Sequence, residues 1–258
     1  MIAAAIATQP QVHAQVHRSG TIAHVTIGDG SCANALSQQQ WGELAAVATQ
    51  LGADHEVRTV VFRGAGATFC AGFRIDEWRG ATEADVDASF GAMEAALQAV
   101  EAIPVPTLAV VQGVAAGAGC QLALACDLRV ATSSARLGMP ILRLGILCSP
   151  AFALRLSAVC GVARAKELLF TGRLVAAPEA AGYGLLTQVV GDAALDTTVT
   201  DLASTLAGQP RSGLLAAKSA AGIGLQSLLS AHDTPAWRCS DPAEFPARIG
   251  RFLDRSGK

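Results

Sequence analysis

The sequence has few charged residues and no cluster of basic ones. Asp, Glu, Lys and Arg make up 16% of its 258 residues, and the formal net charge is −2. Nucleic-acid binding requires a basic patch or stripe, so that class of function is excluded. The 51% of hydrophobic residues indicates a folded chain with a sizeable core, and the length fits one large domain or two small ones. Such a chain can also bury surface against copies of itself.

The sequence also lacks the cysteine spacings of a metal site or a disulfide framework. Its seven cysteines are odd in number and scattered, none forms a CxxC pair, and most stand inside apolar stretches. This usage is typical of buried thiols in a reducing compartment. We therefore expect a cytoplasmic protein without a metal site.

No stretch has the pattern of a leader or of a membrane helix. The first residues, MIAAAIATQPQVHA, have no basic segment before their apolar part, and Gln9 and Pro10 interrupt it, so we expect a frayed lead-in. The longest uncharged span, residues 103–126, contains prolines, glycines and Gln121. A buried strand, a turn and a helix fit that span better than a membrane helix.

Strand and helix patterns alternate along most of the chain. Short alternating or β-branched runs predict strands at 21–27, 57–62, 107–111, 128–131 and 187–190. Helical spacing predicts helices at 37–54, in a stretch that follows the loop at 63–73 and ends near Ile103, at 149–161 and 162–172, and at 178–186. The alternation predicts an α/β architecture. From about Asp192 onward only helices are predicted, at 194–208, 213–229 and 243–254.

Two loops of small residues share one design, in which a buried strand is followed by a tight turn and a helix. They are VVFRGAGATFCAGF (60–73) and VVQGVAAGAGCQLA (110–123). Small side chains at such a turn let a ligand oxygen approach the unpaired N–H groups of the backbone. Neither loop matches a phosphate-binding pattern. The alternative is that the glycines serve only tight turns and close packing of helix on strand.

Four segments resemble, in order and at family spacing, motifs of the crotonase (enoyl-CoA hydratase/isomerase) superfamily. They are TFCAGFRI, QGVAAGAGCQLALACDLRVA, RLGMPILRLGI and AKELLFTGRLVAAPEAAGYGLLTQVV. The resemblance extends from about Thr21 to Val190 and implies an α/β fold, a spiral of ββα units. It implies a crotonase-like core with an acyl-CoA pocket at 1–191, and a helical region at 192–258 that packs subunits into homotrimers or hexamers.

The resemblance also implies a site. The family binds acyl-CoA thioesters and holds the thioester carbonyl between two backbone N–H groups, which stabilise the enolate oxygen because they already point at it. In this sequence those donors correspond to Phe73 and Ala118. The coenzyme-binding positions correspond to Ala33, Ala71, Gly72, Arg74 and Gly117. Coenzyme A enters as part of the substrate, and no permanent cofactor, nucleic acid or membrane is expected as a partner.

The sequence departs from the family pattern at both catalytic carboxylates. The two glutamates correspond to Gln121 and Ile141, neither of which can exchange a proton, so water addition by the usual route should lose about 10²–10⁴-fold per group. Ser31 and Asp76 stand where relatives carry basic residues for the coenzyme phosphates. Arg63, Arg74 and Arg79 are candidates to replace those charges.

Three further residues are weak candidates for chemistry. Asp76 and Glu77 follow the first donor turn, where solvated charge at a helix start is the simpler interpretation. Ser149 has no histidine near it in the sequence, so a helix N-cap is the simpler role, and a serine hydrolase is disfavoured. Isomerisation, decarboxylation, carbon–carbon cleavage and a catalytically silent acyl-CoA-binding protein remain open.

Overall fold

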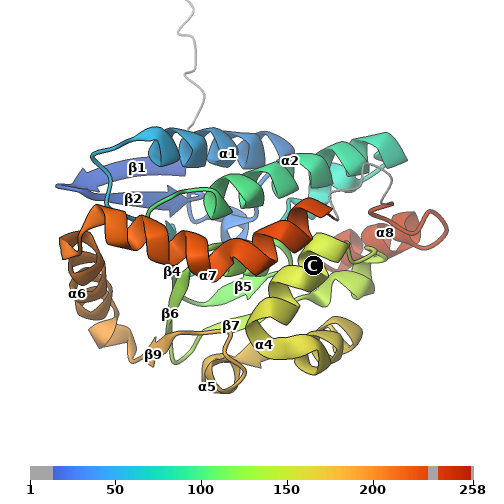
Figure 1. Cartoon of the computed structure of the whole chain (residues 1–258). Helices are drawn as coiled ribbons and strands as arrows, with labels where there is room; N and C mark the ends of the chain where they lie inside the picture. Colours follow the sequence, from blue (N-terminus) through green and yellow to red (C-terminus); the bar gives the residue numbers. More distant parts are fainter. Residues whose placement is uncertain (1–13, 232–237, 257–258) are drawn as a thin grey trace, which may run out of the picture.

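The computed structural model describes residues 14–231 and 238–256, and its centre is a six-stranded sheet (Figure 1). The first strand runs antiparallel to the second, and all other neighbours are parallel. In order across the sheet, the strands are β1 (Ala14–Ser19), β2 (Ile22–Ile27), β3 (Thr59–Gly64), β4 (Thr107–Val111), β6 (Leu128–Thr132) and β9 (Gln188–Val190). The predicted strands are confirmed, and β1 is an addition, since its residues were not predicted as a strand.

A second, three-stranded sheet carries the turns that lead to the site. It consists of β5 (Val114–Ala116), β7 (Arg136–Gly138) and β8 (Leu174–Ala176), with β5 and β7 parallel and β7 and β8 antiparallel. Strands of three residues are too short to show a periodicity, which is why the sequence did not predict them.

Helices cover the sheets and make up the other regular elements of the described chain. They are α1 (Gln38–Ala53), α2 (Glu83–Glu101), α3 (Ala118–Ala125), α4 (Pro150–Thr171), α5 (Ala177–Gly182), α6 (Leu195–Gly208), α7 (Arg211–Ala231) and α8 (Phe245–Ser256). Short 3₁₀ helices are η1 (Ser31–Asn34), η2 (Ile75–Trp78), η3 (Pro140–Leu144) and η4 (Asp192–Ala194). The two stretches predicted at 149–172 form the single helix α4, which kinks at Gly161, where φ is +75°.

Both faces of the large sheet are buried at its central strands β3, β4 and β6. On β3, Val60 and Phe62 belong to the main hydrophobic core, whereas Val61 faces a smaller cluster that α6 closes with Leu195 and Val199. This alternation follows from the two-residue period of a strand. In Figure 1, α1 and α2 lie together above the sheet, and α6 and α8 lie at opposite ends of the molecule.

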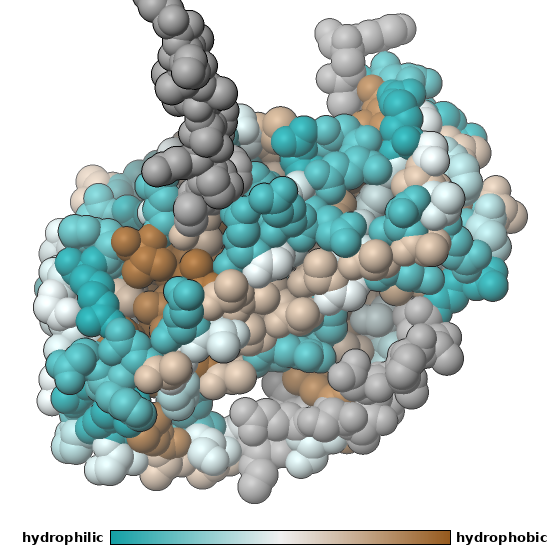
Figure 2. Space-filling view, turned by 90° about the horizontal axis from the view of Figure 1, so that it is seen from above, coloured by the Kyte–Doolittle hydropathy of each residue, from teal (hydrophilic) through white to brown (hydrophobic). Residues whose placement is uncertain are grey.

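The helices after residue 191 pack against the preceding part of the chain. Helix α8 returns to pack against η2 and η3, so it takes part in the region where the two glycine-rich loops meet. The face that carries α1 and α2 presents mostly hydrophilic residues, with small hydrophobic patches between them (Figure 2). Among the described residues no helix is long and apolar enough to cross a membrane. The division into 1–191 and 192–258 stays a prediction.

Candidate functional site

The two glycine-rich turns pack against each other through their backbones. Cys70 N–H donates to Val114 O (3.1 Å), and Ala116 N–H donates to Cys70 O (3.1 Å). A Cβ added at Gly72 would lie 2.8 Å from Ala116 O and 3.2 Å from Ala118 N. At Gly72 φ is +104°, which favours glycine further. The glycine at position 72 therefore permits the close approach of the two turns.

Each turn presents one backbone N–H that donates to no residue in the described part of the chain. Leu36 N–H donates to Gly72 O and Arg74 N–H donates to Leu36 O, both at 2.8 Å, in the pattern of a parallel bridge. In that pattern the N–H of Phe73 points away from Leu36. Ala118 is the first residue of α3, so its N–H has no partner within the helix. Two unpaired donors on adjacent turns can bind one oxygen atom.

A cavity of about 840 Å³ opens beside these donors and is lined by both of their residues. Ala71, Ala116 and Gly117 complete the donor side. Most of the remaining wall is apolar, and it includes Trp78 of η2, Phe90 and Met93 of α2, and Phe152 of α4. The size and apolar lining are typical of small-molecule sites.

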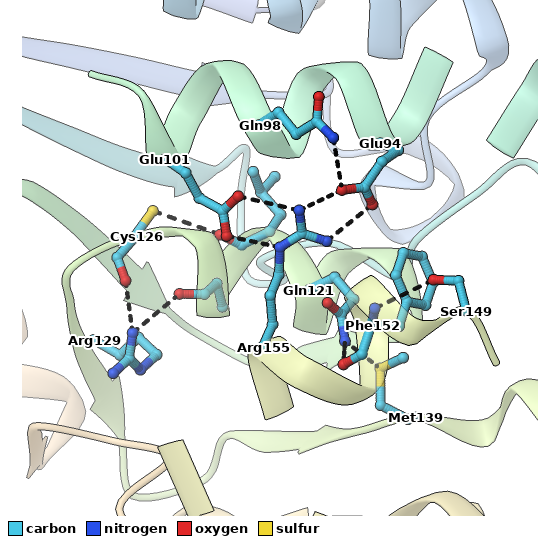
Figure 3. Close-up of polar contacts among 12 residues, drawn as sticks. Glu94, Gln98, Glu101, Gln121, Cys126, Arg129, Met139, Ser149, Phe152 and Arg155 are labelled. Atoms are coloured by element: carbon cyan, nitrogen blue, oxygen red, sulfur yellow. Dashed lines mark hydrogen bonds and ion pairs between the residues drawn. The ribbon is translucent and has the colours of Figure 1, made fainter. Parts of the chain in front are cut away.

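The two positions that correspond to the lost glutamates differ in where their side chains lie. Ile141 lines the cavity, with its Cγ2 3.9 Å from where a Cβ on Gly117 would stand. Gln121 is fully buried and is not among the residues that line the cavity. Its Nε2 donates to Phe152 O (3.2 Å) and contacts Met139 Sδ (3.6 Å), as Figure 3 shows. Its Oε1 accepts no hydrogen bond from a described residue.

The acidic residues after the first donor turn are engaged elsewhere and do not line the cavity. Asp76 accepts two hydrogen bonds from Arg74, at 2.9 and 2.5 Å, and this guanidinium lowers the pKa of Asp76. Glu77 Oε2 accepts from Gln38 N–H (3.0 Å) at the start of α1. Both carboxylates therefore bind structural partners and do not face a ligand in the cavity.

Ser149 and the cysteines offer no nucleophile at the cavity. Ser149 is the N-cap of α4, as its sequence context predicted, and its hydroxyl accepts a hydrogen bond from Phe152 N–H (3.2 Å). Burial raises the pKa of Cys70 and of Cys120 to about 12, and that of Cys148 to about 11. Thiols with such pKa values stay protonated and unreactive near neutral pH.

Ala33 lies next to the first donor turn, in a left-handed segment. Cys32, Ala33 and Asn34 all have φ between +48° and +56°, and Ala33 O accepts from Ala71 N–H (2.9 Å). The buried Asn34 holds this segment: its Nδ2 donates to Ala65 O (2.9 Å) and Thr68 O (2.7 Å), and its Oδ1 accepts from Gly30 N–H (2.8 Å). The segment thereby fixes the backbone on the outer side of the donor turn.

Four arginines that were not predicted as site residues also line the cavity. They are Arg143 of η3 and Arg248, Arg251 and Arg255 of α8. The spacing of the last three, i, i+3 and i+7, places them on one helix face and is the signal that could have found them. The arginines that the sequence did suggest do not line the cavity: Arg63 pairs with Asp196, Arg74 with Asp76, and Arg79 with Asp254.

A buried ion-pair cluster fixes the two helices that form the sides of the cavity (Figure 3). Arg155 of α4, whose side chain is 1% exposed, donates to Glu101 Oε1 (2.7 Å) and to Glu94 Oε2 (2.9 Å), both on α2. It lies one helical turn after Phe152. The cluster therefore sets the position of the α4 wall against the α2 wall.

The comparisons with known proteins agree with this architecture. Residues 17–232 match the family model described as enoyl-CoA hydratase/isomerase. The human "Enoyl-CoA hydratase domain-containing protein 2, mitochondrial" is 38% identical over 197 residues, which is 74% of this chain and 68% of the human one. The short-chain-enoyl-CoA hydratase of Clostridium acetobutylicum is 32% identical over 213 residues, 82% of this chain and 81% of that protein.

Solved structures are similar over almost the whole chain. The enoyl-CoA hydratase/carnithine racemase of Magnetospirillum magneticum superposes with a TM-score of 0.77 at 31% identity, covering 94% of this chain and 88% of that one. The chain belongs to the enoyl-CoA hydratase/isomerase family and has the crotonase fold. Both expectations from the sequence are confirmed.

Proposed function

We propose that the cavity binds an acyl-CoA thioester, with its carbonyl oxygen between the N–H groups of Phe73 and Ala118. The observation that carries this proposal is the pair of unpaired donors on two turns that pack backbone to backbone at the wall of a cavity. Fixed donors of this kind stabilise the negative charge that develops on the oxygen as an enolate forms, because they need no reorganisation during the reaction. Coenzyme A is then part of the substrate.

The reaction is one that does not need two carboxylates at the cavity. Among the described residues no Asp or Glu lines it, so water addition has neither its base nor its acid. Isomerisation, decarboxylation and carbon–carbon cleavage remain, with protons supplied by substrate or solvent. Asp76 and Glu77 do not serve as shuttles, since Arg74 and the start of α1 engage them. The same missing acids favour a second candidate, an acyl-CoA-binding protein without catalysis.

Calorimetric titration with butyryl-CoA tests the binding proposal. Gly72→Ala places a methyl group 2.8 Å from Ala116 O and separates the two turns, so we expect affinity to fall about tenfold or more. Gly66→Ala is the matched control, because φ is +66° there but a Cβ meets no atom within 4 Å. Unchanged affinity in a folded Gly72→Ala protein would rule out the donor assignment.

We further propose that copies of the chain assemble into trimers in the cytoplasm, with the helices after Asp192 at the contacts. Family membership supports this assembly. Sedimentation of the purified protein at three or six times the chain mass of 26.3 kDa is the expected result. Sedimentation at the mass of a single chain would contradict it.

A further inference from the structure

The helix that carries the second donor is buried along its whole length. All eight residues of α3, from Ala118 to Ala125, are buried. Its first turn packs against the first donor turn, since a Cβ added at Gly119 would collide with Cys70 O. A helix has a positive partial charge at its N-terminus and a negative one at its C-terminus. In buried surroundings such charges act more strongly than in water, so the group that binds the C-terminal end of α3 affects the donors.

A buried arginine binds the C-terminal end of α3. Arg129 is 7% exposed, and its side chain donates to Cys126 O (2.7 Å) and to Ala123 O (3.5 Å). Figure 3 shows the contact with Cys126 at this end of the helix. The Nε of Arg129 donates to Leu185 O (2.8 Å). All three acceptors are neutral backbone carbonyls, so the guanidinium closes the C-terminus of α3 and links it to the segment before β9.

Arg129 forms no ion pair within the described part of the chain. The neighbouring acid, Asp127, pairs with Lys218 Nζ (2.7 Å) and accepts hydrogen bonds from Thr107. Burial lowers the pKa of Arg129, but a guanidinium keeps its proton at neutral pH. Burying a charge without a counter-charge is costly, and a neutral donor can also satisfy a carbonyl group. The positive charge at this end of α3 is therefore in excess.

We infer that Arg129 is a positioning residue for the second donor, and that its charge stabilises the enolate oxygen bound at Phe73 and Ala118. It holds the buried end of α3, and it offsets the negative end of the helix, which would otherwise oppose the positive end at Ala118. The eight residues of α3 span about 12 Å. At that distance a unit charge in partly buried surroundings changes an ionisation constant about tenfold. The inference rests on the proposed function, because it concerns the oxygen that this function places at the two donors.

Acetoacetyl-CoA is the probe, because its acyl group ionises to an enolate that absorbs strongly in the ultraviolet. Titration of this absorbance with pH gives the ionisation constant of the bound thioester. We expect the constant to be higher in the complex with the intact protein than in water, since the donors favour the enolate. Arg129→Gln should lower the constant of the complex about tenfold. Arg129→Lys keeps the charge and should stay within about twofold of the intact protein.

Lys218→Met is a second variant, which leaves the hydrogen bonds of Arg129 in place. Without Lys218 the carboxylate of Asp127 loses its counter-charge at the same end of α3. The ionisation constant should fall about threefold, less than in Arg129→Gln because the Asp127 side chain is 32% exposed. Arg164→Gln is the control, since it removes a charge that is 53% exposed and lies outside the cavity lining, and it should leave the constant unchanged. Thermal unfolding of each variant verifies that it is folded.

The outcomes separate this inference from the proposed function. An ionisation constant no higher in the complex with the intact protein than in water would overturn both. A raised constant that Arg129→Gln leaves unchanged would overturn the inference alone. Equal losses in Arg129→Gln and Arg129→Lys would do the same, because Arg129 would then act only through its hydrogen bonds. If Arg129→Gln does not fold, Lys218→Met decides, and an unchanged constant in that variant overturns the inference.

Discussion

At the scale of single residues, positions 121 and 141 are not equivalent although both lack the family's glutamate. Ile141 belongs to the cavity wall, whereas Gln121 is buried between α3 and the start of α4 and donates to Phe152 O. A carboxylate at 141 would therefore face a bound ligand. A carboxylate at 121 would meet the carbonyl oxygen of Phe152 and would be held protonated by burial and repulsion.

The variant Ile141→Glu should consequently gain hydratase activity that Gln121→Glu does not. We expect crotonyl-CoA hydration in Ile141→Glu to exceed that of the parent by about 10²-fold, the lower end of what one acid or base contributes. Loss of the conjugated thioester's ultraviolet absorbance measures the reaction. Activity in Gln121→Glu alone would mean that the side chain at position 121 reaches the substrate and does not stay buried against Phe152 O.

At the scale of elements, Arg155 links α4 to α2, the two helices that contribute Phe152, Phe90 and Met93 to the cavity wall. Arg155 is 1% exposed, and its two partners Glu94 and Glu101 are 21% and 18% exposed. Removing the arginine leaves two carboxylates in a partly buried place without their counter-charge. Breaking a buried pair in this way is strongly destabilising.

Arg155→Leu should lower the free energy of unfolding by about 3 kcal/mol, at the lower end of the range for buried pairs because both glutamates retain some contact with water. Urea unfolding followed by circular dichroism measures it. Arg164→Leu is the control: Arg164 is 53% exposed and pairs with Glu167 at 3.9 Å, so its loss should cost under about 1 kcal/mol. Similar losses in the two variants would show that the cluster contributes no more than a surface pair.

Most of the regular elements could be predicted from the sequence, and the exceptions have physical reasons. β3 and β4 are short, β-branched and bounded by turns, which is a strong local signal. Strands such as β5 and β7 exist because their partners come from distant parts of the chain, and no local pattern encodes that pairing. The sequence predicted two helices that meet at Gly161, and the kink of α4 lies at that residue. The sequence did not predict that the two parts form one element.

The sequence likewise predicted part of the candidate site. Phe73, Ala118 and Ile141 line the cavity, as their motifs indicated, because strand and turn set those positions locally. The direction of Gln121 depends on a carbonyl 31 residues later in the chain, and no motif records it. The arginines of α8 join the cavity only because that helix returns to η2 and η3, which is a property of the tertiary structure.

At the scale of the whole molecule, the sheets hold two backbone turns in contact, and the helices close a cavity around them. The large sheet positions β3 and β4, which lead into those turns, and α8 returns from the end of the chain to add charge to an otherwise apolar wall. We propose that this arrangement polarises a thioester carbonyl through the N–H groups of Phe73 and Ala118.

Infrared difference spectroscopy of crotonyl-CoA labelled with ¹³C at the thioester carbonyl measures this polarisation. Two hydrogen bonds to the oxygen weaken the C=O bond, so we expect the carbonyl band to move to lower frequency in the complex. Gly72→Ala should reduce the shift, and Gly66→Ala should keep it. A bound thioester whose carbonyl band stays at its frequency in water, or shifts equally in both variants, would show that Phe73 and Ala118 do not hold the carbonyl oxygen.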